Sequence, residues 1–287
     1  MTKTVPLSHP DKVLFPKGKI TKQELYDYYE SVAKLMLPLI KNRPISMKRY
    51  PQGIKEEGFF QKNAPEGMPK WVKTVHVERR ERAAIDMVLC NDKATLLWLA
   101  NQNCITPHIW LSKINKPDYP DLLVFDLDPP ARKGFKVVVE AALLLKKILE
   151  KEYKLKTFVT TTGSKGLHVV VPIKPTRHYD EVREFAKAIA ERLAEEYPTK
   201  YTVENRIAKR RGRLYIDVLR NAQGQTVMAP YSVRPLEGAP IATPLFWEEL
   251  KDPSLKSTSF TIRNIHKRLK KNPWAGIERF AKTIPKL

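Results

Sequence analysis

Two aspartates stand one residue apart in the segment LLVFDLDPP, residues 122 to 130. Four apolar residues precede Asp126 and two prolines follow Asp128, which is typical of a buried strand that ends abruptly. Side chains alternate between the two faces of a strand, so both carboxylates point to the same side. Their repulsion costs stability unless a cation offsets it. A turn or strand-end cap is the commoner explanation of such a pair, and a metal site is the chemical one.

A second candidate for chemistry is the loop TTGSKGLH, which ends at His168. Gly163 and Gly166 let backbone amides approach an anion, and Ser164 and Lys165 can donate hydrogen bonds to it. The loop lacks the G-x-x-x-x-G-K spacing and the following helix of a Walker loop. It is therefore either an ordinary hairpin turn or a binding loop for a phosphate group.

The elements that must position these residues follow from hydrophobic periodicity. Short apolar runs predict strands, and longer stretches with apolar residues at helical spacing predict helices whose outer faces are charged. The resulting order is β-α-β-β-α-β, the split βαβ arrangement of ferredoxin-like and RNA-recognition-like sheets, in an α/β fold of the α+β kind with flanking helices. The predicted strands are 121–127, 156–161, 167–173 and 214–220, and the predicted helices are 135–153 and 179–197.

This topology brings distant residues together. In the usual ferredoxin-like sheet the first strand lies between the third and the fourth, so Asp126 and Asp128 are expected beside His168 and Asp217. Three carboxylates on adjacent strands make a metal site the better interpretation. Hard oxygen ligands suit Mg²⁺ or Mn²⁺. Two such ions would offset the repulsion and could clamp the attacking and leaving oxygens of a phosphoryl transfer.

The composition points to a polyanionic partner. The chain of 287 residues has a net charge of +21, and nucleic acid is the first partner that such an excess suggests. No apolar run approaches the roughly 18 to 20 residues of a membrane-spanning helix, and the N-terminus lacks the apolar core of a signal peptide. We therefore expect a soluble, cytoplasmic and nucleoid-associated protein. Cys90 and Cys104 have no zinc-ribbon or disulfide pattern, so we expect both in the core.

Several segments, in the same order along the chain, resemble the polymerase domain of bacterial ligase D, a member of the archaeo-eukaryotic primase superfamily. They are HPDKVLFP, ITKQELYDYY, RPISMKRYPQGI, GFFQKNAP, CITPHIW, VFDLDPP, TTGSKGLHVVVPI and YIDVLRN. The resemblance implies a stand-alone form without ligase or phosphoesterase domains. It also implies one primase-polymerase domain over 1–287, in which a second small sheet accompanies the catalytic sheet. Its parts are a nucleotide- and DNA-contacting part (1–110), a catalytic core (121–220) and a C-terminal part (221–287).

The resemblance also assigns roles to single residues. It makes Asp126, Asp128 and Asp217 catalytic metal ligands, and it places Lys12 and Lys22 at the 5′-phosphate across a DNA gap or break. The residues that it places at the incoming nucleotide are Lys48, Phe60, His108, Thr162, Ser164, Lys165, His168, Arg220 and Arg234.

Structural alternatives stay open for some of these residues. His108 could be a satisfied core histidine, and the two lysines could be ordinary surface residues. One residue of the pair Phe59 and Phe60 is expected to face inward, and Phe60 is expected to stack on the base. Thr162 stands where the family commonly has serine, near the sugar. Threonine keeps the hydroxyl but adds a methyl group, so this difference concerns the selectivity for ribose more than catalysis.

Two further segments lie outside the core. Thr21 and Glu24 form the pattern of a capping box, so Lys22 falls in the first turn of a helix, where its charge opposes the helix dipole. An anion bound at this helix start would offset that cost. The basic segment 263–280 could grip a DNA backbone or form an amphipathic helix docked on the protein, and it is given no role in the site.

These observations predict a DNA-directed DNA and RNA polymerase of non-homologous end joining. It would fill gaps and extend 3′ ends at double-strand breaks, use Mn²⁺ or Mg²⁺ and nucleoside triphosphates, and favour ribonucleotides. The expected partners are DNA ends and gaps that carry a 5′-phosphate, Ku and an ATP-dependent DNA ligase. The alternatives are a primase that starts chains and, in a different class, a non-catalytic nucleic-acid-binding module. A D-x-D glycosyltransferase fits the charge and the core poorly.

Overall fold

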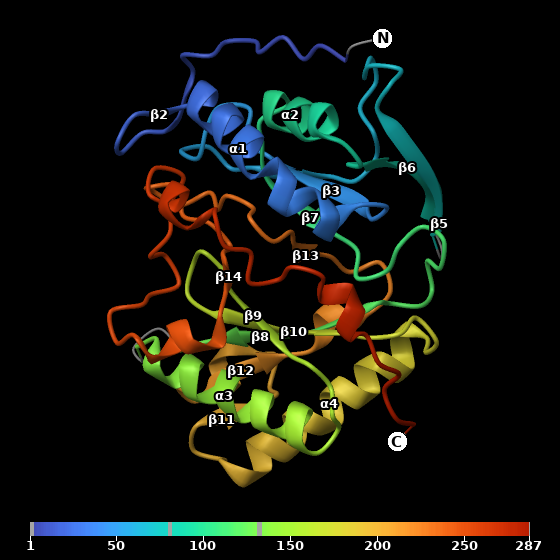
Figure 1. The fold of residues 1–287 in the computed structure, drawn as a ribbon, viewed down its shortest axis with the longest axis vertical. Coiled ribbons are helices and arrows are strands. Elements are labelled where there is room, and N and C mark those ends of the chain that lie inside the picture. The colour runs from blue at the N-terminus through green and yellow to red at the C-terminus, as the bar shows by residue number, and fades with distance from the viewer. Residues whose placement is uncertain (1–2, 80–81, 131–133, 287) are drawn as a thin grey trace. The chain divides into compact units, whose positions relative to one another are not determined.

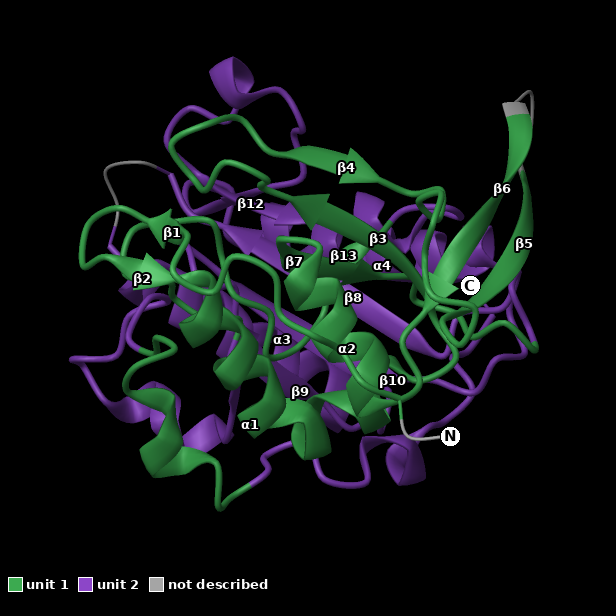
Figure 2. Cartoon of the chain, turned by 90° about the horizontal axis from the view of Figure 1, so that it is seen from above, with its two compact units in different colours: residues 1–115, 226–242, 260–271 green, residues 116–225, 243–259, 272–287 purple. Residues whose placement is uncertain are grey.

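The computed structural model describes residues 3–79, 82–130 and 134–286. The chain forms two compact units, each built from several segments (Figures 1 and 2). Within the described ranges, no helix is long and apolar enough to cross a membrane. Unit 1 contains residues 1–115, 226–242 and 260–271, and unit 2 contains residues 116–225, 243–259 and 272–287.

Unit 2 contains the predicted split βαβ core. Its sheet has the strand order β11-β12-β8-β10-β9-β14, and helices α3 and α4 cover one face of it (Figure 1). Strand β8 lies between β10 and β12 and pairs antiparallel with both, so the prediction that the first core strand is central is confirmed. The elements are β8 (Leu122–Asp128), α3 (Lys136–Lys151), β9 (Phe158–Thr161), β10 (Leu167–Pro172), α4 (Tyr179–Glu196), β11 (Tyr201–Thr202), β12 (Leu214–Asp217) and β14 (Pro244–Leu245).

Strand β12 is shorter than the predicted strand 214–220. After Asp217 the chain turns into the short 3₁₀ helix η2 (Leu219–Asn221). The buried side chain of Asn221 takes over the pairing with β8, because its Oδ1 accepts from the Val124 amide at 2.9 Å and its Nδ2 donates to the Val124 carbonyl at 2.7 Å. The strand therefore ends at the carboxylate that the site needs, and its continuation is still anchored to the central strand.

Unit 1 contains the second sheet and two helices. The sheet has the order β13-β7-β3-β6-β5, and β4 pairs with β3. A second small sheet was expected, but among the described residues this sheet has six strands, as many as the sheet of unit 2. The elements of unit 1 are β1 (Val13–Phe15), β2 (Ile20–Thr21), α1 (Lys22–Ile40), β3 (Pro44–Arg49), β4 (Phe59–Gln61), β5 (Lys73–Arg79), β6 (Arg82–Leu89), α2 (Lys93–Asn101), β7 (Cys104–Ile109) and β13 (Val227–Met228).

Both cysteines lie in the core of unit 1, as predicted. Cys90 and Cys104 are fully buried and are free thiols. Burial raises the pKa of Cys104 to about 12 and that of Cys90 well above its ordinary value. Neither thiol is therefore a ready nucleophile or metal ligand.

The C-terminal part of the chain does not form one block. Residues 226–242 and 260–271 belong to unit 1, whereas 243–259 and 272–287 belong to unit 2. The amphipathic helix considered for residues 263–280 is wrong. The segment forms two short 3₁₀ turns, η4 (Ile265–Arg268) and η5 (Ile277–Phe280), because Pro273 and Gly276, at φ 63°, interrupt the helix. One domain over residues 1–287 stays a prediction.

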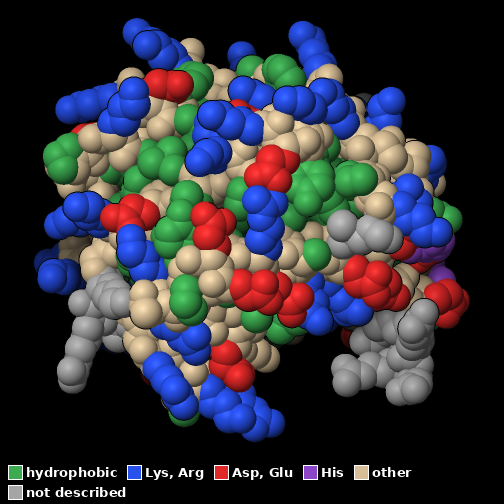
Figure 3. Space-filling view, turned by 90° about the horizontal axis from the view of Figure 1, so that it is seen from below, with side chains coloured by type: hydrophobic (Ala, Val, Ile, Leu, Met, Phe, Trp, Pro, Cys, Tyr) green, Lys and Arg blue, Asp and Glu red, His purple; other side chains and the backbone are tan. Residues whose placement is uncertain are grey.

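The basic residues are not gathered in one patch on the face drawn in Figure 3. Lys and Arg side chains are spread over this face, and acidic side chains lie among them. The charge excess therefore indicates the kind of partner but does not locate its binding site on this face. The site has to be found from the buried polar groups.

Candidate active site

The three predicted aspartates converge at the end of the central strand of unit 2. In the register of the sheet, Asp126 of β8 is paired with both His168 of β10 and Asp217 of β12. Asp128 lies two residues further along β8, on the same face. One carboxylate oxygen from each aspartate lies within 4.8 Å of the others. The convergence that the sequence predicted is therefore present.

Burial and like charge act on these carboxyl groups. Burial and the neighbouring Asp126 and Asp217 raise the pKa of Asp128 to about 6. Burial also raises the pKa of Asp217, although the Leu219 amide donates to its Oδ1 at 2.8 Å and Arg220 lies 3.7 Å from its Oδ2. The cluster thus resists carrying three negative charges unless a cation joins it.

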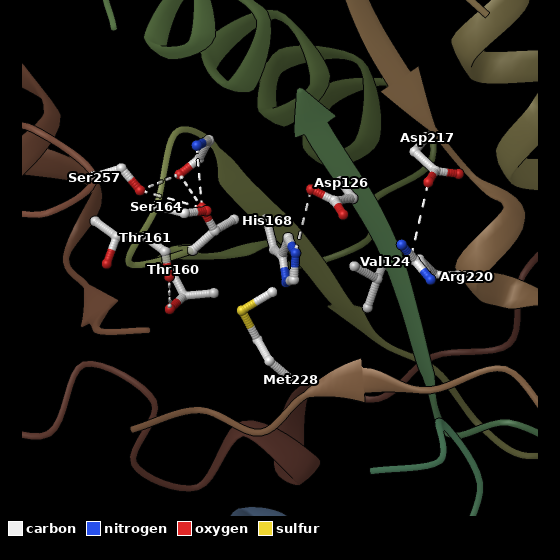
Figure 4. A network of polar contacts seen from close by, with 12 residues as sticks. Val124, Asp126, Thr160, Thr161, Ser164, His168, Asp217, Arg220, Met228 and Ser257 are labelled. Atoms are coloured by element: carbon white, nitrogen blue, oxygen red, sulfur yellow. Dashed lines mark hydrogen bonds and ion pairs between the residues drawn. The ribbon is translucent and has the colours of Figure 1, made fainter. Parts of the chain in front are cut away.

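His168 links the acids to the neighbouring loop. Its ring is buried, and Nε2 lies 3.3 Å from Asp126 Oδ1. In Figure 4 the imidazole lies between this carboxylate and the hydroxyl groups near Ser164 and Ser257. The donor set of the acids consists of carboxylate oxygens, which fits a hard divalent cation such as Mg²⁺ or Mn²⁺.

Two residues beside the acids were missed by the sequence reasoning. The Tyr215 hydroxyl donates to Asp217 Oδ1 at 3.2 Å, and burial raises the pKa of this tyrosine. The guanidinium carbon of Arg210 lies 4.0 Å from the Tyr215 ring centroid, and its charge acts to lower the pKa of Asp128. Strand alternation could have found Tyr215, because it stands two residues before Asp217 and must face the same side. Arg210 lies in a loop and gave no such signal.

The predicted phosphate loop follows β9 and returns to β10 beside the acids. Gly163 has φ 65°, a conformation that favours glycine. A Cβ at Gly166 would lie 2.0 Å from the Leu127 carbonyl oxygen, so only glycine lets the loop approach β8 at the residue before Asp128. Both glycines are therefore needed, one for the turn and one for the close approach to the acidic cluster.

The side chains of the loop divide into inward and outward ones. Thr162 is buried, and its Oγ1 lies 3.1 Å from Ser164 Oγ and accepts from the Gly166 amide at 3.1 Å. It also lies 3.2 Å from Ser257 Oγ. Ser164 is half-buried and Lys165 is exposed. Thr162 therefore serves the internal bonding of the loop, and its contact with a nucleotide stays a prediction. Ser257 was missed, because no motif surrounds it.

Unit 1 brings together Lys48, Phe60 and His108, three of its predicted nucleotide contacts. Lys48 and Phe60 are paired in the register of β3 and β4, and the Lys48 ammonium lies 4.7 Å from the Phe60 ring centroid. The ring of His108 lies 5.1 Å from that of Phe60 at an interplanar angle of 68°. The expectation that Phe59 or Phe60 is core is wrong, since they are 47% and 52% exposed. Among the described residues, β4 pairs with β3 alone.

Arg234, the fourth predicted contact in unit 1, reaches the same sheet through Met228. Its Nη1 lies 3.0 Å from Met228 Sδ, and Met228 is paired with His108 in the register of β13 and β7. The histidine is half-buried, and its Nδ1 lies 3.1 Å from the Thr106 carbonyl oxygen, so the alternative of a satisfied core histidine stays open. Arg220, by contrast, lies in unit 2 beside Asp217.

The two lysines near the N-terminus lie together in unit 1. Thr21 caps α1 through the predicted capping box: its Oγ1 accepts from the Glu24 amide, and Glu24 Oε2 accepts from the Thr21 amide at 3.0 Å. The Lys22 amide donates to the Lys12 carbonyl at 2.9 Å.

Lys22 is not an ordinary surface lysine. It is only 2% exposed, and its ammonium donates to Ser8 Oγ at 3.0 Å. Burial, and then the positive charges of Lys12 and Arg49, lower its pKa to about 8. A cationic cluster at a helix start is a site where an anion would be stabilised.

Comparisons with known proteins agree with this geometry. The family model described as "LigD, primase-polymerase domain" matches residues 21–274. The chain belongs to this family. Its members are nucleotidyltransferases of the archaeo-eukaryotic primase superfamily, as the resemblance implied.

The relatives carry the name of an end-joining protein. The bifunctional non-homologous end joining protein LigD of Bacillus subtilis is 37% identical over 262 residues, which is 91% of this chain and 42% of that protein. The multifunctional LigD of Mycolicibacterium smegmatis is 31% identical over 89% of this chain and 34% of that protein. The chain thus spans about a third to two fifths of these relatives.

A solved structure has the same fold. The polymerase domain of Mycobacterium tuberculosis ligase D, determined in complex with DNA, matches with a TM-score of 0.89 and 28% identity. The match covers 98% of this chain and all of that one. The predicted fold class, a primase-polymerase fold around a split βαβ sheet, is therefore confirmed.

Proposed function

We propose that this protein is a DNA-directed polymerase of non-homologous end joining that fills gaps and extends 3′ ends at double-strand breaks. The observation that carries the proposal is the convergence of Asp126, Asp128 and Asp217 beside a glycine-containing loop. Metal-bound acids together with a phosphate-binding loop are what transfer of a nucleotide to a 3′-hydroxyl requires. The end-joining LigD relatives supply the biological setting.

The acids would hold Mn²⁺ or Mg²⁺, with Asp126, Asp128 and Asp217 as ligands. Bound there, the ions would supply Lewis-acid chemistry that activates the primer hydroxyl and stabilises the leaving pyrophosphate. Asp217 is fixed by the Leu219 amide and the Tyr215 hydroxyl. His168 Nε2 lies 3.3 Å from Asp126 Oδ1. The chain itself thus orients the Asp217 carboxylate before any ligand binds.

The candidate nucleotide contacts of each unit are considered separately. Ser164, Lys165 and the loop amides would donate to the triphosphate, and Arg220 would add positive charge at the acids. In unit 1, Phe60 offers an exposed ring for base stacking, with His108 and Lys48 against it. Arg234 would be a further phosphate contact. We also propose a preference for ribonucleotides, as the family resemblance implies.

The DNA would be recognised at a break rather than along any duplex. Lys12 and Lys22 would bind the 5′-phosphate on the far side of a gap, because a buried ammonium next to other cations is stabilised by an anion. Ku and an ATP-dependent DNA ligase are proposed as partners in the cytoplasm, at the nucleoid. The mycobacterial polymerase domain solved in complex with DNA supports binding to DNA.

Extension of a gapped duplex tests the proposal. A primer and template with a short gap and a downstream 5′-phosphate are incubated with Mn²⁺ or Mg²⁺ and with ATP and dATP at equal concentration. The proposal predicts metal-dependent addition of one or a few nucleotides, with ATP used at least as readily as dATP. Binding without any addition under either metal would contradict the polymerase assignment. A strong preference for dATP would contradict only the ribonucleotide preference and would point to Thr162.

A further inference from the structure

A basic pocket lies at the end of the catalytic sheet away from the acids. It has a volume of about 470 Å³ and is lined by residues 150–156 at the end of α3 and residues 279–282 at the end of η5, all in unit 2. The second segment is anchored to the sheet, because Lys282 forms a parallel bridge with Ile173. Ile173 follows β10 and lies five residues beyond His168, about 17 Å away at roughly 3.4 Å per residue. The basic pocket is therefore separate from the acidic site.

The basic pocket carries an excess of positive charge. Among the described residues that line it, Glu150 is the only acid, and its carboxylate is already bound by the Lys146 ammonium and accepts from the Thr157 hydroxyl at 2.7 Å. Lys156 lies 3.8 Å from the same carboxylate. The exposed cations that line the pocket are Lys154, Lys156, Arg279 and Lys282. Apart from Lys156, these cations form no ion pair within the described ranges, so an anion would be stabilised here.

The positions of these cations are partly fixed by the chain. The Lys154 ammonium donates to the Lys151 carbonyl at 2.7 Å, and the Lys282 ammonium donates to the Lys154 carbonyl at 2.9 Å. An ammonium has three donors, so each lysine keeps donors for a ligand. The stem of Arg279 lies close to Gly276, where an added Cβ would be 3.2 Å from Arg279 Cδ. The carbonyls at the end of α3 explain the placement of the two lysines but not that of Arg279.

An exposed aromatic ring lies beside the cations. Phe280 is 44% exposed, and its ring lies 5.8 Å from that of Phe158 at an interplanar angle of 60°. Phe158 also packs against the buried Trp274, whose indole nitrogen donates to the Val159 carbonyl at 3.1 Å. Phe280 is therefore supported by buried aromatic residues and still offers surface to a ligand.

We propose that the basic pocket binds single-stranded nucleic acid, with one base stacked on Phe280 and the neighbouring phosphate groups bound by Arg279 and the lysines of the pocket. Aromatic rings beside cations suit an unpaired strand, because each base has a face that can stack and each phosphate group carries a charge. A duplex would use the cations but not the ring, since its bases are stacked on one another. The proposal goes beyond nucleotide addition and gives the end of the basic segment 263–280 a role.

The test measures the affinity of the full chain for a labelled oligothymidylate and for a blunt duplex by fluorescence anisotropy. EDTA is present, so that no metal joins a strand to the acids. Phe280→Leu keeps an apolar contact with Phe158 and removes the flat ring. We expect this variant to bind the single strand about 10-fold more weakly, which is within the range for stacking of one base, and the duplex less than 2-fold more weakly.

The salt dependence separates the cations from the ring. Each phosphate contact contributes about 0.7 to the slope of log affinity against log salt concentration for a single strand. Arg279→Gln should reduce this slope by about that amount, whereas Phe280→Leu should leave it unchanged. Phe246→Leu is the matched control, because it changes another exposed phenylalanine of unit 2, and it should bind both nucleic acids like the unsubstituted chain.

Photo-crosslinking with an oligothymidylate that carries 5-iodouracil locates the strand independently of its affinity. A cross-link in the peptide that contains Phe280 is expected, and it would support the proposal even if the protein added no nucleotide. No cross-link in that peptide would overturn the proposal, as would a Phe280→Leu variant that binds the single strand like Phe246→Leu or loses equal affinity for strand and duplex. Polyglutamate that displaced the strand and lost as much affinity through Phe280→Leu would overturn it in favour of an acidic protein segment.

Discussion

The acidic cluster should destabilise the metal-free protein, and removing one charge should stabilise it. Asp128 is half-buried, and its pKa is raised from 3.8 to about 6. A carboxyl whose pKa is higher in the folded state favours folding only while it is protonated. As the pH rises from about 4 to about 6, the carboxyl is ionised in the unfolded chain but still protonated in the folded one, so the free energy of unfolding decreases.

The size of the effect follows from the shift. A change of one pKa unit corresponds to about 1.4 kcal/mol, so the shift of Asp128 corresponds to at most about 3 kcal/mol. Water at the half-buried carboxyl screens part of this energy. We expect Asp128→Asn to raise the free energy of unfolding of the metal-free protein at pH 7.5 by about 1 to 3 kcal/mol, with a smaller gain at pH 4.5.

Urea unfolding in the presence of EDTA, at several pH values between 4.5 and 8, measures this difference. Asp118→Asn is the matched control, since its carboxylate is exposed and accepts from the Gln223 amide at 2.6 Å. Added Mn²⁺ should stabilise the unsubstituted chain and should stabilise Asp128→Asn much less. If Asp128→Asn lowered the stability of the metal-free protein equally at every pH, this would contradict the claim that repulsion between the three acids destabilises the folded state.

Two further predictions concern the loop and the lysines. Gly166→Ala should reduce nucleotide addition at least 100-fold while duplex binding stays within about 3-fold, because a Cβ would lie 2.0 Å from the Leu127 carbonyl oxygen. Gly134→Ala, where a Cβ has no neighbour within 4 Å, is the control, and a Gly166→Ala variant as active as Gly134→Ala would refute the close approach. Lys12→Ala combined with Lys22→Met, which keeps the buried stem, should weaken binding to gapped DNA with a 5′-phosphate by about 1 to 3 kcal/mol. In a fluorescence binding assay, the affinity for the same DNA with a 5′-hydroxyl should change far less. Equal losses of affinity for the two DNAs would mean that the lysines only attract the DNA backbone in general.

The catalytic sheet could be predicted because its signals are local and regular. The apolar run before Asp126 and the amphipathic pattern of α3 are visible in a window of a few residues, and the split βαβ topology then fixes which strands are neighbours. The pairing of Asp126 with both His168 and Asp217 followed from that topology.

The sequence could not reveal features that depend on contacts between distant segments. Ser257 reaches the loop from 91 residues beyond Gly166, in a segment without periodicity. Both Phe59 and Phe60 are exposed, which the alternation of a strand pattern cannot show. Lys22 was predicted at the start of α1, but its burial, its hydrogen bond to Ser8 and the nearby charges of Lys12 and Arg49 were not.

The most direct test of the central claim is primer extension by Asp126→Ala and Asp217→Ala on gapped DNA with Mn²⁺. Both carboxylates belong to the cluster within 4.8 Å, and removing either should abolish nucleotide addition. Duplex affinity should stay within a few fold, since it comes from Lys and Arg contacts to phosphate groups. The account predicts no detectable extension by either variant, and extension at the unsubstituted rate by one of them would contradict the assignment of the three acids as the metal site.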